Sequence, residues 1–362
     1  MKKERSSNIE LCRIIAMFMI LLHHAVVHSR SLNIGPSYPN YWISLALVPA
    51  GKVAFDAFIA ISCWFLADAK FKCERFIKTY AEVLFYSVLT TVAAFLLGSE
   101  LSVFEWIGCF LPITGAVQGY AQTYLAFYLL IPFLSRVSAG MTKFQNKILI
   151  GILFTFVFVF RVMSSLFWNE QSVYSRLTLF IFFYFLFTYI KRNPIKLLDN
   201  VWFCLGVFLL GYGSLVGINY GSVLLPDFVG WKYLSILAPD EGGLLNIISG
   251  ISLFLVFKNI NIRTNKIINL CAGSSFAVLL IHDGHFFRSW TWTISHISEW
   301  FFSPWYPVRL IVTAVIIYAI CMYVDIIRKY TVEHFLVSNA RISQFCSRIN
   351  EKLNLDSHEH SC

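Results

Sequence analysis

The sequence predicts an all-α, polytopic membrane protein with about ten transmembrane helices. Of its 362 residues, 57% are hydrophobic and 17% are aromatic, whereas only 14% are charged. A soluble globular protein of this length has no need of so much apolar surface, and apolar stretches of about 20 residues are typical of membrane-spanning helices. The apolar segments lie at residues 9–27, 53–69, 77–97, 121–138, 148–168, 173–190, 201–218, 234–257, 267–287 and 308–327.

The distribution of basic residues predicts the orientation of these segments. The net charge of +9 could suggest a nucleic-acid partner. With the N-terminus in the cytoplasm, however, lysine and arginine gather in every second connection, as the positive-inside rule requires. Both termini are then cytoplasmic, the outer loops hold few cations (such as Arg30 and Lys232), and no nucleic acid is needed to explain the charge. The cytoplasmic cations are Lys70, Lys72, Arg75, Lys78, Arg136, Lys143, Lys147, Lys191, Arg192, Lys196, Lys258, Arg263, Lys266, Arg328 and Lys329.

The first apolar segment follows a basic stretch, as a signal peptide would. It ends in His23 and His24 rather than in a small-x-small cleavage site, so we interpret it as a retained helix. A shorter apolar run at residues 103–117 is expected to be re-entrant or interfacial. No linker or repeat is evident, and residues 1–329 are predicted to form one transmembrane domain.

Residues 330–362 form a short polar tail that we expect to be cytoplasmic. Phe335, Ile342, Phe345 and Ile349 give it an amphipathic pattern, which predicts a helix lying on the membrane or on the bundle. The closing run at residues 358–362 contains two histidines but is typical of a frayed terminus. The nine cysteines show no CxxC spacing. No metal site is therefore expected.

Two residues of the first segment, Arg13 and His24, are the strongest candidates for chemistry. They are eleven residues apart, which on an α-helix returns to about the same face and spans about 16 Å. Ionisable residues inside a membrane segment indicate a functional site by default. Imidazole suits general-base work on a hydroxyl, and guanidinium suits a phosphate or carbonyl oxygen. The alternative for a lone histidine is a buried residue hydrogen-bonded within the bundle, but His23 beside His24 and Arg13 on the same face favour a function.

Two further groups of charges lie in the second and third segments. Lys52 and Asp56 have the spacing of an ion pair, but Asp56 could instead orient the imidazole of His24. Arg75 and Lys78 share a helix face where the third segment begins, and could hold the phosphates of a nucleotide-containing donor. Most of the charge in this stretch is interpreted as topological, and Glu82 could simply neutralise Lys78.

The late part of the chain adds two more candidates. His282 and Asp283 close the ninth segment and need partners there; Arg161 is isolated in the fifth, and its partner is not predicted. Aromatic residues crowd residues 286–306 and could form an interfacial belt or a stacking platform for sugar rings. These aromatic residues are Trp290, Trp292, Trp300, Trp305 and Tyr306.

Several motifs resemble those of the integral membrane acyltransferase type 3 family, particularly of bacterial members that O-acetylate surface polysaccharides. Arg13 and His24 match its arginine–histidine signature, and residues 55–66, FDAFIAISCWFL, look like its aspartate–aromatic–Ser-Gly-Tyr-Phe-Leu segment. Residues 70–86, 124–134 and 279–283 are similar to its basic stretch, its central helix and its late Tyr-Leu-Ile-His pattern. Cys63 replaces a glycine of the family, and Lys78 replaces the second of two paired arginines.

The resemblance implies an acetyl-CoA-dependent O-acyltransferase of the bacterial cytoplasmic membrane, with acyl-CoA as co-substrate and no bound cofactor. The acceptor would be a hydroxyl of an envelope or capsular polysaccharide, or of its lipid-linked oligosaccharide precursor, with membrane lipid around the protein. His24, Arg13 and Asp56 would be catalytic, His24 as base or nucleophile, and Arg75 and Lys78 would bind acyl-CoA. His23, His282, Asp283, Trp290 and Trp292 would support the site or the acceptor. A flippase or transporter of an envelope glycan or lipid, and a glycan polymerase, are the alternatives.

Overall fold

The computed structural model confirms an all-α membrane protein. It describes residues 6–29, 31–67, 69–111, 119–160, 162–163, 175–230, 234, 237, 241–285 and 287–354, and within these residues no strand occurs. Six helical segments of the described chain are long and apolar enough to cross a membrane. They are α1 (Ser7–His28), α2 with α3 (Pro39–Leu47 and Ala50–Leu66), α4 (Cys73–Leu96), α6 (Gly119–Gly140), α10 (Val201–Leu224), and α16 (Tyr306–Arg328) with its extension.

Shorter helices complete the bundle. Two of them are apolar: α12 (Leu244–Asn259), and α13 (Lys266–Ala272) continued by α14 (Ser275–His282). Another, α7 (Lys143–Phe154), runs through a π-helical turn at Thr155–Val159 and packs against α9 (Arg176–Arg192). Parts of the predicted fifth and eighth segments lie outside the described residues, as does Arg161, so the count of about ten stays a prediction.

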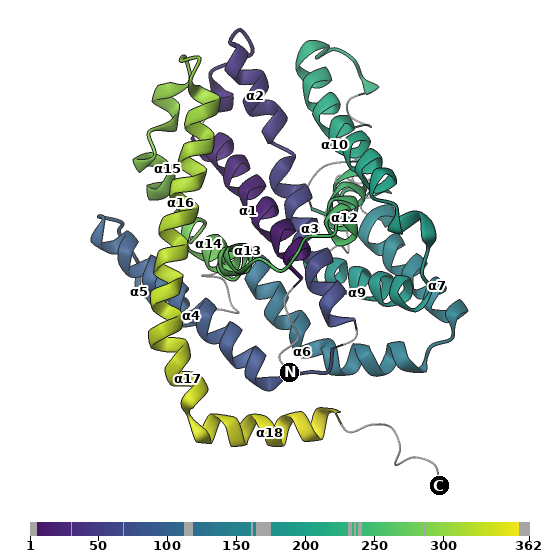
Figure 1. The fold of residues 1–362 in the computed structure, drawn as a ribbon. Helices are drawn as coiled ribbons and strands as arrows, with labels where there is room; N and C mark the ends of the chain where they lie inside the picture. The colour runs from purple at the N-terminus through teal and green to yellow at the C-terminus, as the bar shows by residue number, and fades with distance from the viewer. Residues whose placement is uncertain are drawn as a thin grey trace.

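Helix α1 lies at the centre of the bundle. It contacts α3 and α12 on one side and α13, α14 and α16 on the other (Figure 1). Small buried residues, such as Ala16 and Ala25 of α1 and Ala57 of α3, allow this close packing. Helix α12 also approaches α3 closely, because a Cβ on Gly250 would lie 2.5 Å from the Cβ of Asp56. Helix α3 is therefore packed against both α1 and α12.

Two of the connections between the longer helices contain short helices of their own. The short helix α5 (Val103–Cys109) begins at a capping box formed by Ser102 and Glu105, and the predicted re-entrant run continues into residues 112–118, which lie outside the described residues. Helix α15 (Arg288–Ile294) follows α14 and contacts α1. The segment expected to be an outer aromatic loop is thus partly helical.

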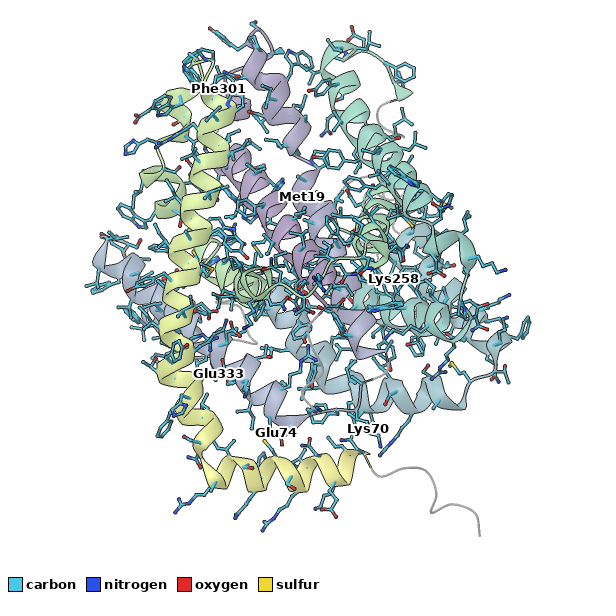
Figure 2. The ribbon with its side chains drawn as sticks, viewed as in Figure 1. Met19, Lys70, Glu74, Lys258, Phe301 and Glu333 are labelled. Carbon is cyan, nitrogen blue, oxygen red and sulfur yellow. The ribbon has the colours of Figure 1, made fainter. Side chains whose placement is uncertain are left out.

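The C-terminal residues 329–354 form an arm that folds back under the bundle. Helix α16 continues through a π-helical turn at Lys329–Glu333 into α17 (His334–Ser338), and α18 (Ala340–Asn354) follows. The arm is the yellow end of the ribbon in Figure 1, with α18 crossing below α4. Figure 2 places Glu74 and Lys70 at this end of the molecule and Phe301 at the opposite end. Ile342 and Ile349 of α18 pack against the core, whereas Phe335 and Phe345 are exposed.

Candidate active site

One cavity of about 510 Å³ connects the two ends of α1 that carry candidate residues. From α1 it is lined by one broad helix face, made of Arg13, Met17, Ile20, His23, His24, Val27 and His28. Arg13 and His24 therefore share one cavity, as their separation in the sequence predicts. We refer to its two ends as the Arg13 end and the His24 end.

The ring of His24 is oriented by His282. The Nδ1 atom of His282 lies 2.5 Å from the carbonyl oxygen of Val278, and the Nε2 atom of His282 lies 3.0 Å from Nδ1 of His24. A carbonyl oxygen only accepts hydrogen bonds, so the proton of neutral His282 is on Nδ1 and its Nε2 is an acceptor. Neutral His24 must then donate from Nδ1, which leaves its Nε2 unprotonated. This chain of two hydrogen bonds fixes His24 in the tautomer that a base requires.

The carboxylate beside His24 belongs to Asp283. Its Oδ1 atom lies 3.7 Å from Nδ1 of His24, and it also contacts the guanidinium of Arg288. Such a carboxylate would stabilise a protonated His24. Asp56, which the sequence suggested for this role, is fully buried where α3 packs against Gly250 of α12. From α3, the residues that line the cavity are Gly51, Lys52, Phe55, Phe58 and Ser62.

Other residues support the histidines. The Nδ1 atom of His23 lies 2.6 Å from the carbonyl oxygen of Val48. Trp292 is buried, with its ring 6.5 Å from the rings of both His24 and His28. Trp290 instead donates to the hydroxyl of Ser99. His28 was not singled out from the sequence, although it lies one turn after His24, a spacing that could have identified it.

His24, His28 and Asp283 could in principle hold a metal ion, because their ligand atoms lie within 4.8 Å of one another. Two imidazoles and a carboxylate are a common ligand set for transition metals. However, the guanidinium of Arg288 next to Asp283 would repel a cation. The cluster therefore fits a hydrogen-bonded base better than a metal site.

Ion pairs also line the His24 end. Glu241, in the turn before α12, contacts Arg176 and lies 3.1 Å from the ammonium of Lys52. Glu241 is outside the membrane-spanning helices; burial alone would raise the pKa of its carboxyl, but Lys52 and Arg176 hold it below its ordinary value. The sequence left open whether Lys52 pairs with Asp56, four residues further on. The carboxylate of Glu241 that Lys52 contacts at the cavity is 189 residues away.

Two guanidinium groups line the Arg13 end. Arg13 contacts Glu10 at 3.3 Å and the ring of Phe65 at 5.6 Å. Arg75, in the first turns of α4, lies over the ring of Tyr128 at 5.7 Å. The hydroxyl of Tyr128 is bonded to the backbone of Lys72, which ties this ring to the start of α4. Arg75 is thus held at the cavity by an aromatic support.

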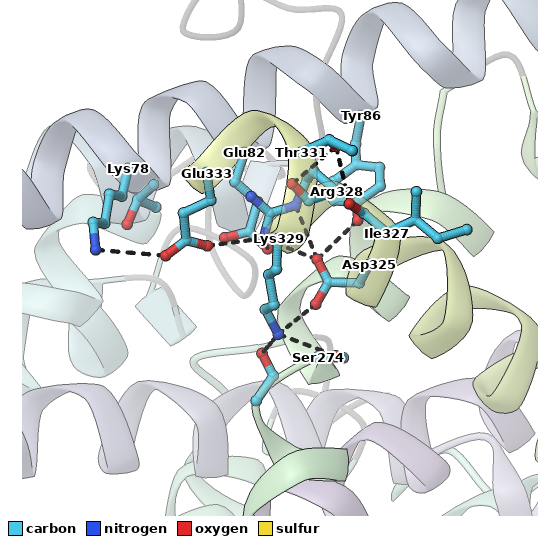
Figure 3. Close-up of polar contacts among 12 residues, drawn as sticks. Lys78, Glu82, Tyr86, Ser274, Asp325, Ile327, Arg328, Lys329, Thr331 and Glu333 are labelled. Carbon is cyan, nitrogen blue, oxygen red and sulfur yellow. Dashed lines mark hydrogen bonds and ion pairs between the residues drawn. The ribbon is translucent and has the colours of Figure 1, made fainter. Parts of the chain in front are cut away.

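Lys78, which the sequence grouped with Arg75, turns toward the C-terminal arm. Its Nζ atom lies 3.5 Å from a carboxylate oxygen of Glu333. Glu82 was expected to neutralise Lys78, but it contacts Arg328 at 3.3 Å. Figure 3 shows these residues in one network with Asp325, which also binds the ammonium of Lys329 at 2.6 Å. The partners of Lys78 and Glu82 come from the far end of the chain, so local spacing could not identify them.

The comparison with protein families gives one result that covers this site. A model of an acyltransferase domain, that of the acyltransferase type 3 family, matches residues 6–325. Comparisons with curated proteins and with solved structures give no match. The matched residues include both ends of the cavity and every helix that lines it, and on this evidence the chain belongs to the acyltransferase type 3 family and is a membrane acyltransferase.

Proposed function

We propose that the protein transfers an acetyl group from acetyl-CoA to a hydroxyl of an envelope or capsular polysaccharide, or of its lipid-linked precursor. The observation that carries this proposal is the single cavity with Arg13 and Arg75 at one end and the oriented imidazole of His24 at the other. The charge distribution favours a cytoplasmic location for the Arg13 end and for both termini, in the cytoplasmic membrane of a bacterium. A cytoplasmic donor and an outer acceptor would then meet inside the protein.

The donor would enter at the Arg13 end. Arg75 would bind phosphate oxygens of CoA by charge-assisted hydrogen bonds. Beyond it, Tyr120, Tyr124, Phe276 and Met17 provide a largely apolar wall for the pantetheine arm. Arg13 lies in this path and would orient the pantetheine chain or the thioester oxygen. The pantetheine chain would have to span the distance of about 16 Å along α1 from Arg13 to His24.

The transfer itself would depend on the free Nε2 of His24. Nε2 takes the proton of the acceptor hydroxyl while the hydroxyl oxygen forms a bond to the thioester carbonyl carbon. The C–S bond then breaks, and the departing sulfur of CoA receives the proton from the imidazolium. Throughout, Nδ1–H stays bonded to His282, and the carboxylate of Asp283 stabilises the transient positive charge.

A nucleophilic role for His24 is the alternative mechanism. Nε2 would then carry the acetyl group before the acceptor arrives. Incubation with isotopically labelled acetyl-CoA in the absence of acceptor distinguishes the two. An acetylated His24 supports the nucleophile, and an unlabelled His24 with acceptor-dependent CoA release supports the base.

The proposed function is tested with the purified protein and with cells. Acceptor-dependent release of CoA from acetyl-CoA, together with mass spectrometry of surface glycans from cells with and without the protein, should show acetyl groups that depend on the protein. Movement of a glycan or lipid across the membrane without release of CoA would contradict the proposal and favour a flippase.

His282→Leu should slow transfer without weakening donor binding. The leucine removes the acceptor of the His24 Nδ1–H group, so the ring loses its fixed tautomer. A neutral hydrogen bond contributes about 1 kcal/mol, which corresponds to roughly a fivefold lower kcat. His282→Gln offers an oxygen in nearly the same place and should recover part of the rate. Steady-state release of CoA measures both variants, and an unchanged kcat in His282→Leu would remove His282 from the mechanism.

A further inference from the structure

The C-terminal arm, residues 329–354, contacts α4 at two places, one on each side of Arg75. One contact is at the first turn of α4, and the other is one turn after Arg75. The whole arm, including α18, lies beyond residues 6–325, which the family model matches. The residues that match the family model therefore contribute only the α4 side of these contacts.

The first contact is made by the side chain of Asn350. The first N–H groups of a helix have no partner within the helix, and the side chain of Lys72, the residue before α4, makes no capping bond. The Oδ1 atom of Asn350 accepts a hydrogen bond of 2.7 Å from the backbone N–H of Cys73. Its Nδ2 atom donates to the carboxylate of Glu74 at 2.9 Å. An asparagine of another helix thus caps α4 and holds its first acidic side chain.

Neighbouring contacts hold α18 in this place. Asn354 donates to the carbonyl oxygen of Phe71 at 2.8 Å, just before α4 begins. Arg136 of α6 donates to the carbonyl oxygen of Leu353 at 3.0 Å. Cys73 of α4 and Cys346 of α18 are both buried. Because these two thiols are shielded while α18 is docked, they are natural probes of the docked state.

The second contact is made by Glu333, where α16 passes into α17. Its two carboxylate oxygens lie 3.5 Å from Nζ of Lys78 and 3.6 Å from the guanidinium of Arg328 (Figure 3). Arg328 is buried and also contacts Glu82 and Asp325. Glu333 therefore joins the second turn of α4 to the end of α16. Arg75 lies between the two contacts and is aimed at the cavity.

We propose that the C-terminal arm is a clamp that positions α4 so that Arg75 can bind the donor. Arg75 itself contacts Tyr128 and the cavity, and the clamp acts on the backbone that carries it. Asn350 is in this sense a positioning residue, and Lys78 belongs to the clamp rather than to the donor site. The inference rests on the proposed function, because it takes Arg75 as a ligand of acyl-CoA.

Asn350→Leu in the full-length protein tests the clamp. The leucine removes both hydrogen bonds while filling a similar volume. We expect maleimide to label Cys73 and Cys346 faster, as mass spectrometry of the labelled peptides would measure without any donor. Loss of a helix cap of this kind corresponds to about a fivefold weaker interaction, so KM for acetyl-CoA should rise by about fivefold with kcat within about twofold of wild type. Gln344→Leu, at an exposed position of the same helix, is the matched control and should change neither value.

A pair of variants tests the hydrogen bonds themselves. Asn350→Asp places two carboxylates against each other and should raise both the labelling rate and KM. Combining it with Glu74→Gln restores a donor opposite an acceptor, so the double variant should return toward wild type. Merely structural damage would not be repaired in this way.

The outcomes separate the clamp from the proposed function. Faster labelling of Asn350→Leu with an unchanged KM would mean that α18 docks without setting donor affinity, and would overturn the inference. Labelling and KM equal to those of the Gln344→Leu control would show that Asn350 does not hold α4. A wild-type protein that releases no CoA with any acceptor would instead overturn the proposed function, and with it the premise of the clamp.

Discussion

His24→Ala should lower the rate of acyl transfer by about 10²- to 10⁴-fold, the usual contribution of a positioned general base. The variant removes Nε2 of His24. This is the ring nitrogen of His24 that its hydrogen bond to His282 leaves free to take a proton. Donor binding should persist, because Arg75 lies at the other end of the cavity. The values to compare are kcat for CoA release and the dissociation constant of CoA, in protein that inserts into the membrane as wild type does.

His23→Ala is the matched control for this experiment. His23 is the adjacent histidine and also lines the cavity, but its Nδ1 atom is bonded to the carbonyl oxygen of Val48. Its loss should cost much less activity than the loss of His24. Transfer at the wild-type rate in His24→Ala would exclude His24 both as base and as nucleophile.

The sequence predicts what helix periodicity controls. Arg13 and His24 share a face because eleven residues complete about three turns, and this holds wherever the helix packs. The positions of His282 and Asp283 at the end of an apolar segment also indicated that they need partners. That their partner is His24, and that the bond fixes its tautomer, depends on how α14 packs beside α1.

Rotation of a helix about its axis cannot be predicted from its own residues. Asp56 and Lys52 are one turn apart on α3, yet Lys52 lines the cavity and Asp56 faces α12. The reason is Gly250, whose missing side chain lets α12 approach the Asp56 face of α3. Lys78 likewise shares a helix face with Arg75 in the sequence, but the C-terminal arm provides its carboxylate partner, Glu333. The carboxylate partners of Lys52 and Lys78 are thus set by tertiary packing.

Arg75→Ala should raise the KM for acetyl-CoA by about ten- to a hundredfold with a smaller change in kcat. Hydrogen bonds to charged groups contribute about 1.5–3 kcal/mol each, and a phosphate held by Arg75 would lose this contribution. Uniform binding energy of this kind affects KM more than turnover. Arg75→Lys should give an intermediate KM, since lysine keeps the charge but loses the planar, bidentate geometry and the stacking on Tyr128.

Lys78→Ala provides the contrast that tests which cation binds the donor. Its side chain is 41% exposed and is paired with Glu333, and exposed ion pairs contribute little. We therefore expect a much smaller rise in KM than for Arg75→Ala, and Lys78→Arg should be tolerated. Equal effects of Lys78→Ala and Arg75→Ala would place both cations at the donor phosphates. An unchanged KM in Arg75→Ala would mean that the donor enters elsewhere and that these cations only set the topology. A cavity that bound the phosphates of acyl-CoA at the Arg13 end could not lose the guanidinium of Arg75 without losing affinity.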